Sequence, residues 1–434
     1  MVNECVILAD SSGALVELCG ISLLERLLRT LQRCGIKRVT VLSGTPDPVA
    51  KELARPSWAR AQLDVTMRTR PPGPVKLKHI LETWPDNSRT APLLIIPADA
   101  VFDRRLLSVL MTQTTPAALV DSGLRRRHLQ PLIASVPDTV RGKLCGPAVL
   151  TYDWAVAQNS VLEHALRNGL EHNTLAAVDV SAQPLYYVSM RRKLRPFWFP
   201  APSPENTKFA KSVLFDSIQK GALDIPAWFH VPIETFLISH LCNTRITPNQ
   251  LTLFCNLVAW VVTFLFATGR LGWGLALALV VGVLDGLDGK QARLKVETTQ
   301  TGRIEHWFDA LFEMSWWIAL AWHFHASGQL HNAFAYLLLL LVAEGVDGLA
   351  KASVYFTTGK IIDELGAFER FVRLIGGRRN VYIWILTIGF LFDAPARAFI
   401  TMAWLQVATA IVHLPSAIAN FIRNRHLLRI RLRD

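Results

Sequence analysis

Residues 285–293 have the sequence DGLDGKQAR and follow an apolar run, residues 271–284, that contains no charged side chain. A charged side chain at the centre of a bilayer costs roughly 2.5–3.5 kcal/mol on insertion scales. Two carboxylates, Asp285 and Asp288, at the end of such a run therefore indicate a functional site at the edge of a membrane-spanning helix.

The composition of the whole chain also indicates a membrane protein. At 434 residues, the chain is too long for one ordinary domain. With 51% hydrophobic and 18% charged residues, it is also too apolar for a wholly soluble protein. The net charge of +12 would suit nucleic acid, anionic lipid or phosphorylated substrates. The basic residues gather beside apolar runs, so we expect lipid and phosphorylated substrates and no nucleic acid. The six cysteines show no CxxC pair and indicate reduced, mostly buried thiols.

The first half of the chain has the pattern of an α/β domain. An apolar run from residue 4 breaks at Asp10, helical spacing follows over residues 23–31, and residues 38–42 form a second strand pattern. Further buried strands are expected at residues 93–99 and 117–120. These patterns predict a Rossmann-like α/β domain with a mostly parallel sheet over residues 1–190. The start of the chain has no secretory signal pattern, so we expect this domain to be cytosolic.

Residues 191–245 change in character. A basic stretch and the proline-rich FWFPAPSPEN sequence end the first domain, and a mixed, helical stretch follows. Trp198 and Trp228 would suit a lipid headgroup layer, so this segment is expected to be either a helix at the membrane surface or a solvated linker.

The second half, residues 246–425, alternates between long apolar runs and short polar segments. We expect an all-α bundle of six membrane spans near residues 251–268, 271–287, 305–325, 332–352, 381–393 and 396–421, followed by a basic tail at 426–434. Basic residues gather after the second, fourth and sixth spans, whereas the opposite segments carry Arg270 and Arg397. By the positive-inside rule, a multi-pass protein of the cell (inner) membrane with both termini in the cytosol is expected.

The carboxylates of the second and third spans form a constellation. Asp285 and Asp288 are three residues apart on one helix, and Glu305, Asp309 and Glu313 recur every four residues on the next. Like charges in a low dielectric repel one another unless protons or cations intervene, and oxygen-only ligands favour hard ions. The pattern predicts Mg²⁺ or Mn²⁺, two ions in all, and phosphoryl transfer at the cytosolic face of the membrane. Salt bridges that cap the helix ends are the alternative.

These residues resemble a known family. DGLDGKQAR, eight further residues and Gly302 match the first part of the CDP-alcohol phosphotransferase signature D-x2-D-G-x2-A-R-x8-G-x3-D-x3-D. The resemblance implies transfer of a phospho-alcohol group from a CDP-alcohol to an acceptor hydroxyl, with release of CMP. It also implies the roles of individual residues: metal binding by Asp285, Asp288, Glu305 and Asp309, and a nucleotide site beside Asp285, Gly289, Ala292, Arg293 and Gly302.

The second part of the signature departs from the family pattern, because His306 and Ala310 stand where it has aspartates. Glu305 and Asp309 restore the spacing if the preceding loop is one residue shorter. Asp309 is then the expected catalytic base, together with Arg293 as the second catalytic residue. The pair of Asp309 and Glu313 is the competing assignment.

Three basic residues are candidates for binding the acceptor: Lys351, Arg378 and Arg379. Lys351 lies four residues after Asp347, so an internal ion pair that fills the bundle is its alternative. For the two arginines, attraction of lipid headgroups is the alternative.

The first domain resembles the sugar-phosphate nucleotidyltransferases in its ILADSSG loop and in IIPADAVF, where the resemblance implies Asp99 as a metal ligand. The loop is shortened, and the arginine and lysine of the family pattern have no match here, which favours a catalytically reduced or regulatory domain. The domain order resembles bifunctional enzymes that join an inositol-1-phosphate cytidylyltransferase to a di-myo-inositol-phosphate phosphate synthase.

That resemblance implies a CDP-alcohol donor, a homodimer, and an acceptor that is a polyol phosphate such as inositol phosphate. A lipid donor or acceptor remains open, as does an active first domain that makes the CDP-alcohol from CTP. A transporter or membrane scaffold is the non-enzyme alternative.

Overall fold

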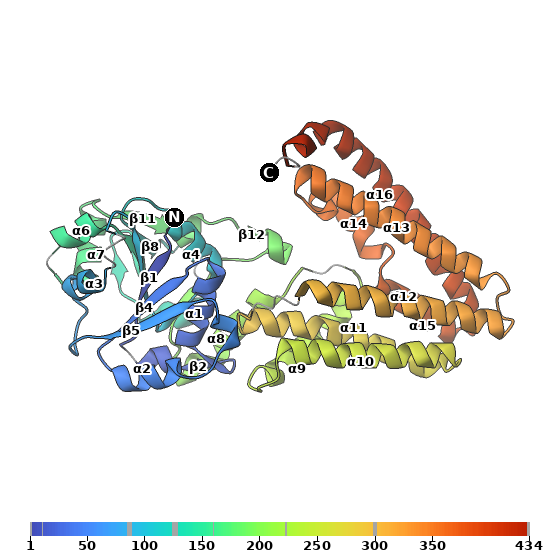
Figure 1. Cartoon of the computed structure of the whole chain (residues 1–434), viewed down its shortest axis with the longest axis horizontal. Helices are drawn as coiled ribbons and strands as arrows, with labels where there is room; N and C mark the ends of the chain where they lie inside the picture. Colours follow the sequence, from blue (N-terminus) through green and yellow to red (C-terminus); the bar gives the residue numbers. More distant parts are fainter. Residues whose placement is uncertain are drawn as a thin grey trace. The chain divides into compact units, whose positions relative to one another are not determined.

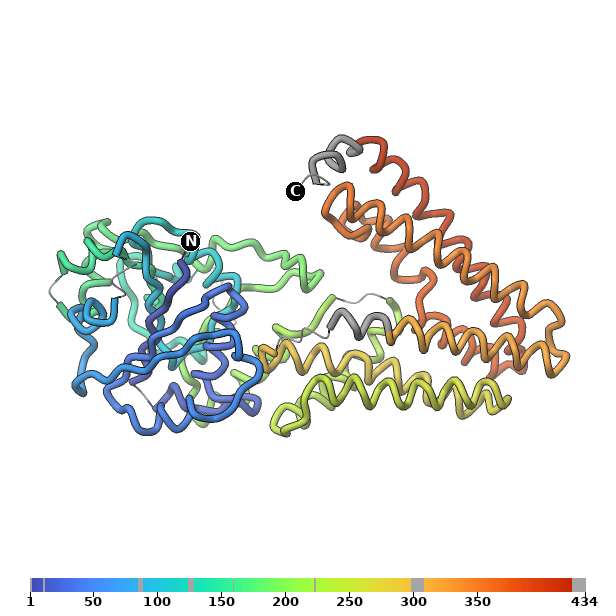
Figure 2. The backbone as a smooth tube through the Cα atoms, in the orientation of Figure 1, coloured from blue at the N-terminus to red at the C-terminus, as the bar shows by residue number. Residues whose placement is uncertain are grey.

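The computed structural model describes residues 2–10, 12–84, 89–123, 129–158, 160–221, 224–297 and 302–431, without the side chains of 302–307 and 424–431 (Figures 1 and 2). The chain forms two compact units. The α/β unit comprises Met1–Lys220, Cys242–Arg245 and Ala292–Thr299, and the helical unit comprises Gly221–Leu241, Ile246–Gln291 and Gln300–Asp434. The domain boundaries expected from the sequence stay a prediction.

An eight-stranded mixed sheet forms the centre of the α/β unit (Figure 1). The path of the sheet is β11 (Ala176–Asp179), β8 (Ala117–Asp121), β10 (Gly142–Leu150), β6 (Leu93–Pro97), β1 (Glu4–Leu8), β4 (Arg38–Ser43) and β5 (Asp64–Thr69), and β9 (Asp138–Thr139) pairs with β10. β1, β4, β5 and β6 run parallel, and β10 runs antiparallel to both β6 and β8. The expected α/β class and the strands expected at residues 4, 38, 93 and 117 are confirmed.

Amphipathic helices cover the sheet because their apolar faces complete its core. The helices of this unit are α1 (Leu23–Arg33), α2 (Pro46–Leu53), α3 (Leu77–Thr83), α4 (Arg104–Met111), α5 (Gln130–Ile133), α6 (Tyr152–Ala157), α7 (Leu162–Glu171) and α8 (Thr207–Ile218). α1 starts at Ser22, whose hydroxyl accepts a hydrogen bond from the Glu25 backbone N–H at 3.1 Å.

Short two-stranded sheets complete the unit: β2 (Glu17–Leu18) with β3 (Ile21–Ser22), β7 (Ala100–Phe102) with β14 (Trp198–Pro200), and β12 (Tyr186–Tyr187) with β13 (Arg192–Lys193). Trp198, which was expected at a lipid headgroup layer, is fully buried in this unit, and its indole N–H donates to Asp121 at 2.9 Å. That expectation was wrong because β14 pairs with β7 and carries the indole into the core. All six cysteines are free thiols, and five of them are buried.

The helical unit contains α9 (Ala227–Leu241), α10 (Pro248–Ala267), α11 (Leu271–Leu294), α12 (Gly302–Ala326), α13 (Ala333–Thr358), α14 (Ala367–Ile375), α15 (Arg379–Leu391) and α16 (Pro395–Arg431). Within the described residues, α10, α11, α13 and the Pro395–Arg423 part of α16 are long and apolar enough to cross a membrane, and α15 is a shorter apolar helix. A helix covers each of the six expected spans, but six crossings stay a prediction.

An aromatic core holds these helices together. Trp316 and Trp317 are fully buried, and their rings stand edge-on to each other with centroids 6.4 Å apart. The indole N–H of Trp316 donates to the carbonyl of Ala259 in α10 at 2.8 Å. On the outside, large apolar side chains such as Leu253, Trp273 and Leu338 are exposed. An apolar outer surface of this kind suits lipid as solvent.

Candidate functional site

Asp288 is held rigidly in the signature helix α11. It is buried, and its carboxylate accepts hydrogen bonds from the Thr252 hydroxyl at 2.6 Å and from the Gly289 backbone N–H at 2.5 Å. Thr252 belongs to α10, whose start is fixed by a capping box between Thr247 and Gln250. The local structure of α10 therefore orients the second carboxylate of the signature.

Asp285 lies one turn earlier in α11 and pairs with a cation. Its carboxylate accepts from the Arg379 guanidinium at 2.6 Å, and Arg379 also lies over the Phe312 ring at 5.0 Å from the ring centroid. The sequence suggested Arg379 as a ligand of the acceptor. In the structure this arginine neutralises a carboxylate of the signature.

Asp309 in α12 completes the described part of the constellation. The charges of Asp285 and Asp288 both act on it, and the charge of Glu313 acts on Arg379. Carboxylates of α11 and α12 therefore influence one another electrostatically, and their assignment to a metal site stays a prediction. Gly302 starts α12, and the side chain of Glu305 lies outside the described residues.

The carboxylates of α11 and α12 can be tested as ligands of a metal ion. Among the described residues, no three His, Cys, Asp or Glu side chains are arranged to hold one. The chemistry of the donors still fits a hard divalent cation, because Asp285, Asp288 and Asp309 offer only carboxylate oxygens. For a cation to bind all three, Asp285 would have to release Arg379.

α9 contributes buried polar groups that the sequence did not reveal. Glu234 is buried and pairs with Lys290 of the signature at 2.8 Å. The close approach depends on glycine: a Cβ atom on Gly286 would lie 2.5 Å from the Glu234 carboxylate, and one on Gly282 would lie 2.9 Å from the His230 ring. The mixed composition of residues 227–241 gave no sign of this contact, and only Gly282 and Gly286 in α11 hinted at a close neighbour.

The other two acceptor candidates have acidic partners. The Arg378 guanidinium lies 3.5 Å from the carboxylate of Asp224, a buried residue that precedes α9 in the chain. Lys351 lies 2.5 Å from Asp347, whose second oxygen is 2.6 Å from His413 in α16. The geometry of Lys351 fits the alternative of an internal ion pair.

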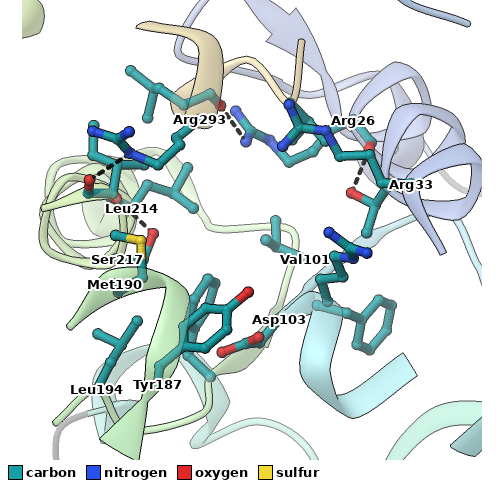
Figure 3. A pocket seen from close by; sticks show the side chains of 17 residues that line it. Arg26, Arg33, Val101, Asp103, Tyr187, Met190, Leu194, Leu214, Ser217 and Arg293 are labelled. Carbon is teal, nitrogen blue, oxygen red and sulfur yellow. Dashed lines mark hydrogen bonds between the residues drawn. The ribbon is translucent and has the colours of Figure 1, made fainter. Parts of the chain in front are cut away.

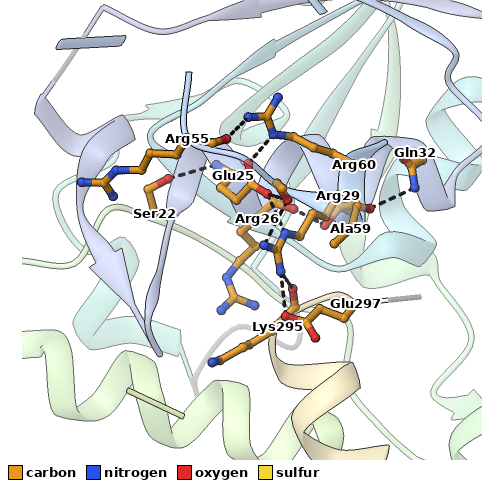
Figure 4. A network of polar contacts seen from close by, with 12 residues as sticks. Ser22, Glu25, Arg26, Arg29, Gln32, Arg55, Ala59, Arg60, Lys295 and Glu297 are labelled. Carbon is orange, nitrogen blue, oxygen red and sulfur yellow. Dashed lines mark hydrogen bonds and ion pairs between the residues drawn. The ribbon is translucent and has the colours of Figure 1, made fainter. Parts of the chain in front are cut away.

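Ala292 and Arg293 belong to the α/β unit by their contacts. The Arg293 Nε donates to the Ile218 carbonyl at 2.9 Å, and the Lys295 ammonium donates to the Thr244 carbonyl at 2.7 Å. Figure 4 shows how α1 holds the adjoining residues: Arg29 donates to the Lys295 carbonyl at 2.9 Å and pairs with Glu297 at 3.2 Å. Buried guanidinium groups therefore fix the end of the signature segment.

The carboxyl ends of β1, β4, β5 and β6 meet at one edge of the sheet, where α/β folds bind ligands. Asp10 follows β1, accepts from the Gly44 backbone N–H at 2.7 Å, and pairs with the guanidinium of Arg70, which follows β5. Asp99 lies two residues after β6, and its backbone carbonyl accepts a hydrogen bond from the Ala201 N–H at 2.7 Å. Arg70 supplies a cation at an edge where the sequence pattern showed none. Ser11 of the loop lies outside the described residues.

His79 adds a titratable group near this edge. Burial lowers the pKa of His79 below its usual 6.5, and the charge of Arg70 adds to that shift. A neutral imidazole near pH 7 can accept a hydrogen bond, and here the Nδ1 atom of His79 accepts from the Lys76 backbone N–H at 3.4 Å.

An α/β unit joined to a helical unit with long apolar helices defines a two-part, membrane-associated protein. Residues 245–412 match the family model of CDP-alcohol phosphatidyltransferase, and residues 11–196 match that of the MobA-like NTP transferase domain. These two matches bear out both resemblances and support a transferase enzyme. Proteins with these domains generally use divalent metals.

Two curated relatives are similar to parts of the chain. Both are named bifunctional IPC transferase and DIPP synthase. The protein from Rubrobacter xylanophilus is 28% identical over 220 residues, which is 50% of this chain and 48% of that protein. The protein from Aquifex aeolicus is 31% identical over 134 residues, which is 30% of this chain and 31% of that protein. The chain thus matches about half of the first relative and about a third of the second.

Solved structures of nucleotidyltransferases are similar to about half of the chain. The inositol-1-phosphate CTP transferase from T. maritima is 11% identical with a TM-score of 0.36, and covers 49% of this chain and 96% of that structure. A UDP-glucose pyrophosphorylase complexed with UDP-glucose is 10% identical with a TM-score of 0.37, and covers 50% of this chain and 100% of that structure.

Proposed function

We propose that this chain is a membrane CDP-alcohol phosphotransferase. The proposal is supported by Asp285 and Asp288 of α11, whose charges act on Asp309 of α12, and by the match of residues 245–412 to the CDP-alcohol phosphatidyltransferase family. In the proposed reaction the acceptor hydroxyl attacks the phosphorus that bears the donor alcohol. The bond from that phosphorus to CMP breaks, and the hydroxyl proton passes to Asp309.

Asp285, Asp288, Glu305 and Asp309 would hold Mg²⁺ or Mn²⁺, which supplies charge stabilisation to the transferring phosphoryl group when bound. Gly289, Ala292, Arg293 and Gly302 would border the cytidine diphosphate. Gly289 suits a close approach because it has no side chain, and its N–H already fixes Asp288.

The acceptor is proposed to be a polyol phosphate such as inositol phosphate, because both curated relatives carry the name DIPP synthase. A lipid donor or acceptor is the competing substrate class. The proposed contacts of the acceptor are Lys351, Arg378 and Arg379, and each would have to leave its carboxylate partner.

The direct test measures CMP release in membranes from a series of CDP-linked alcohols with polyol phosphate or lipid acceptors. The wild type should release CMP with one acceptor class, and Asp288→Asn should not. Equal rates for the two proteins would refute the enzyme and favour a transporter or scaffold.

A second candidate function is a bifunctional enzyme whose α/β unit makes the CDP-alcohol from CTP. Two observations favour it: the match to an NTP transferase domain and the placement of Asp10, Arg70 and Asp99 near one sheet edge. Asp99 is the proposed metal ligand there. Incubation of the full chain with CTP and inositol 1-phosphate tests it, and no pyrophosphate release would leave a catalytically reduced α/β domain.

We further propose the cell membrane as the location, both termini in the cytosol, and a homodimer. Protease accessibility of terminal tags in sealed inverted vesicles tests the orientation, and mass photometry in nanodiscs tests the dimer.

A further inference from the structure

A basic cavity lies inside the α/β unit, away from the predicted site residues except Arg293 (Figure 3). Its volume is about 150 Å³. Figure 3 shows Arg26, Arg33 and Arg293 along one side and Tyr187 and Asp103 on the other. Arg104, at the start of α4, also lines the cavity, so four guanidinium groups surround one small space.

The carboxylate that lines this cavity does not balance these charges. Asp103 pairs with Arg105 at 2.6 Å and caps α4 through the Arg105 backbone N–H at 2.9 Å. Its negative charge is therefore already engaged. Glu297 pairs with Arg29 at 3.2 Å, and its charge also acts on Arg33, so one further carboxylate serves two arginines. The cavity keeps an excess of positive charge, and excess buried charge is unfavourable unless a counter-charge is present.

The arginines also have unfilled hydrogen-bonding capacity. Arg26 donates to the Leu294 carbonyl at 2.6 Å and to the Leu18 carbonyl at 3.0 Å, and Arg33 donates to the Glu297 carbonyl. Within the described residues, the Nε atoms of both arginines are buried and have no partner. A carbonyl supplies only a partial negative charge, so these bonds fix the side chains without neutralising them.

The titration of the two arginines agrees with this geometry. Burial lowers the pKa of Arg26 to about 10, with a contribution from Arg29. Burial likewise lowers the pKa of Arg33 to about 10, and the charge of Arg104 adds to the shift. Both groups remain charged at neutral pH, at a cost that a bound anion would offset.

A second cavity of about 380 Å³ shares three lining residues, Leu194, Phe197 and Ser217, with the first. It also contains Phe209 and Ser212, so it offers both apolar and hydroxyl contacts. Its larger volume suits the body of a small organic molecule.

We propose that these two adjoining cavities bind a small phosphorylated molecule, with its phosphate among Arg26, Arg33 and Arg104 and its body in the second cavity. Guanidinium groups match phosphate oxygens through charge-assisted hydrogen bonds. Arg293 lines the first cavity and is also a proposed neighbour of the cytidine diphosphate. The phosphate site is argued from Arg26, Arg33 and Arg104 alone, so it does not rest on the proposed function.

The test uses the full chain in detergent and equilibrium dialysis with radiolabelled inorganic phosphate. EDTA is present, so that phosphate held through a divalent cation elsewhere is not counted. The cavity variants are Arg33→Gln and Arg104→Gln, and the control is Arg55→Gln, an exposed arginine of the same unit. Arg104 is exposed, so its variant should fold even if Arg33→Gln does not.

The wild type and Arg55→Gln should bind phosphate saturably, with an affinity that falls as salt rises. Arg104→Gln should weaken binding roughly tenfold, because it removes one charged contact. Absence of saturable binding by the wild type would overturn the proposal. So would equal affinity in Arg104→Gln and Arg55→Gln.

Discussion

The guanidinium of Arg379, in the first turn of α15, lies 2.6 Å from the carboxylate of Asp285 in the signature helix. The charges of Asp309 and Glu313 also act on Arg379, so one arginine interacts with carboxylates of both α11 and α12. A protein cation and a metal ion would compete for the same oxygens, and this competition makes the site testable.

Arg379→Gln should therefore raise the apparent affinity for Mg²⁺. The variant removes the cation that competes for Asp285 and leaves neighbouring carboxylates uncompensated, so it should also be less stable without metal by about 1–3 kcal/mol. Thermal unfolding in detergent across a Mg²⁺ titration measures both effects. A smaller Mg²⁺-induced rise in Tm than in the wild type would contradict the assignment of these carboxylates to a metal.

Asp309→Asn should lower the rate of CMP release about 10²–10⁴-fold, the range for loss of a positioned proton acceptor. Glu313→Gln decides between the two assignments made from the sequence. It should lower the rate of CMP release as much as Asp309→Asn does only if Asp309 and Glu313, rather than Glu305 and Asp309, are the metal-binding pair of α12. Asp393→Asn is the matched control: Asp393 has a φ of 55° between α15 and α16, a conformation that Asn also tolerates. A loss of activity in the control would show that the assay reports folding.

Arg70→Gln should abolish nucleotidyl transfer by the α/β unit, if that unit is active, and should leave transfer by the helical unit unchanged. Arg70 pairs with Asp10 beside Gly44, where a nucleotide phosphate would approach the sheet edge. Pyrophosphate release from CTP is measured in parallel with CMP release from a supplied CDP-alcohol. Arg38→Gln, an exposed arginine at the opposite end of β4, is the control. Parallel loss of both activities would instead indicate unfolding.

Much of the constellation was predictable because a carboxylate in an apolar run is conspicuous. Asp285, Asp288 and Asp309 stand out against their neighbours, and their spacing alone places them on helix faces. Glu234 was not predictable, since residues 227–241 have no comparable contrast and its partner is set by tertiary packing. The position of Arg70 beside Asp10 was not predictable for the same reason, because it depends on which strands end at the same edge of the sheet.

The fold shows a similar division. Uninterrupted apolar strands such as β1 and β6 were evident from the sequence, whereas the central strand β10 was not. Its sequence GKLCGPAVL contains Pro147, which argues against a central strand. The structure accommodates it with a register shift between Leu144 and Ala148 and a φ of 106° at Gly146.

Glu297 should make the stability of the α/β unit depend on pH. Burial raises the pKa of this carboxyl above its usual 4.5, with Arg29 opposing the shift. The folded form then binds the proton more tightly than the unfolded form, so stability falls as the pH rises from 4.5 through the raised pKa and is constant above it. Glu297→Gln should flatten this part of a plot of Tm against pH. Glu17→Gln, at an exposed site, should leave the slope as it is, and an unchanged slope in Glu297→Gln would disprove the assignment.

Gly286→Ala should loosen α9 from the signature helix. The added Cβ would lie 2.5 Å from the Glu234 carboxylate, which Lys290 fixes at 2.8 Å, so α9 or the ion pair must shift. We expect a loss of about 1–3 kcal/mol, the usual cost of overpacking, and a higher KM for the CDP-alcohol, since Lys290 lies inside the signature. Gly345→Ala is the matched control, because a Cβ there meets no atom within 4 Å and alanine favours a helix. Thermal unfolding and steady-state kinetics of both variants test this prediction. Equal stability of the two variants would mean that α9 and α11 are not in close contact at Gly286.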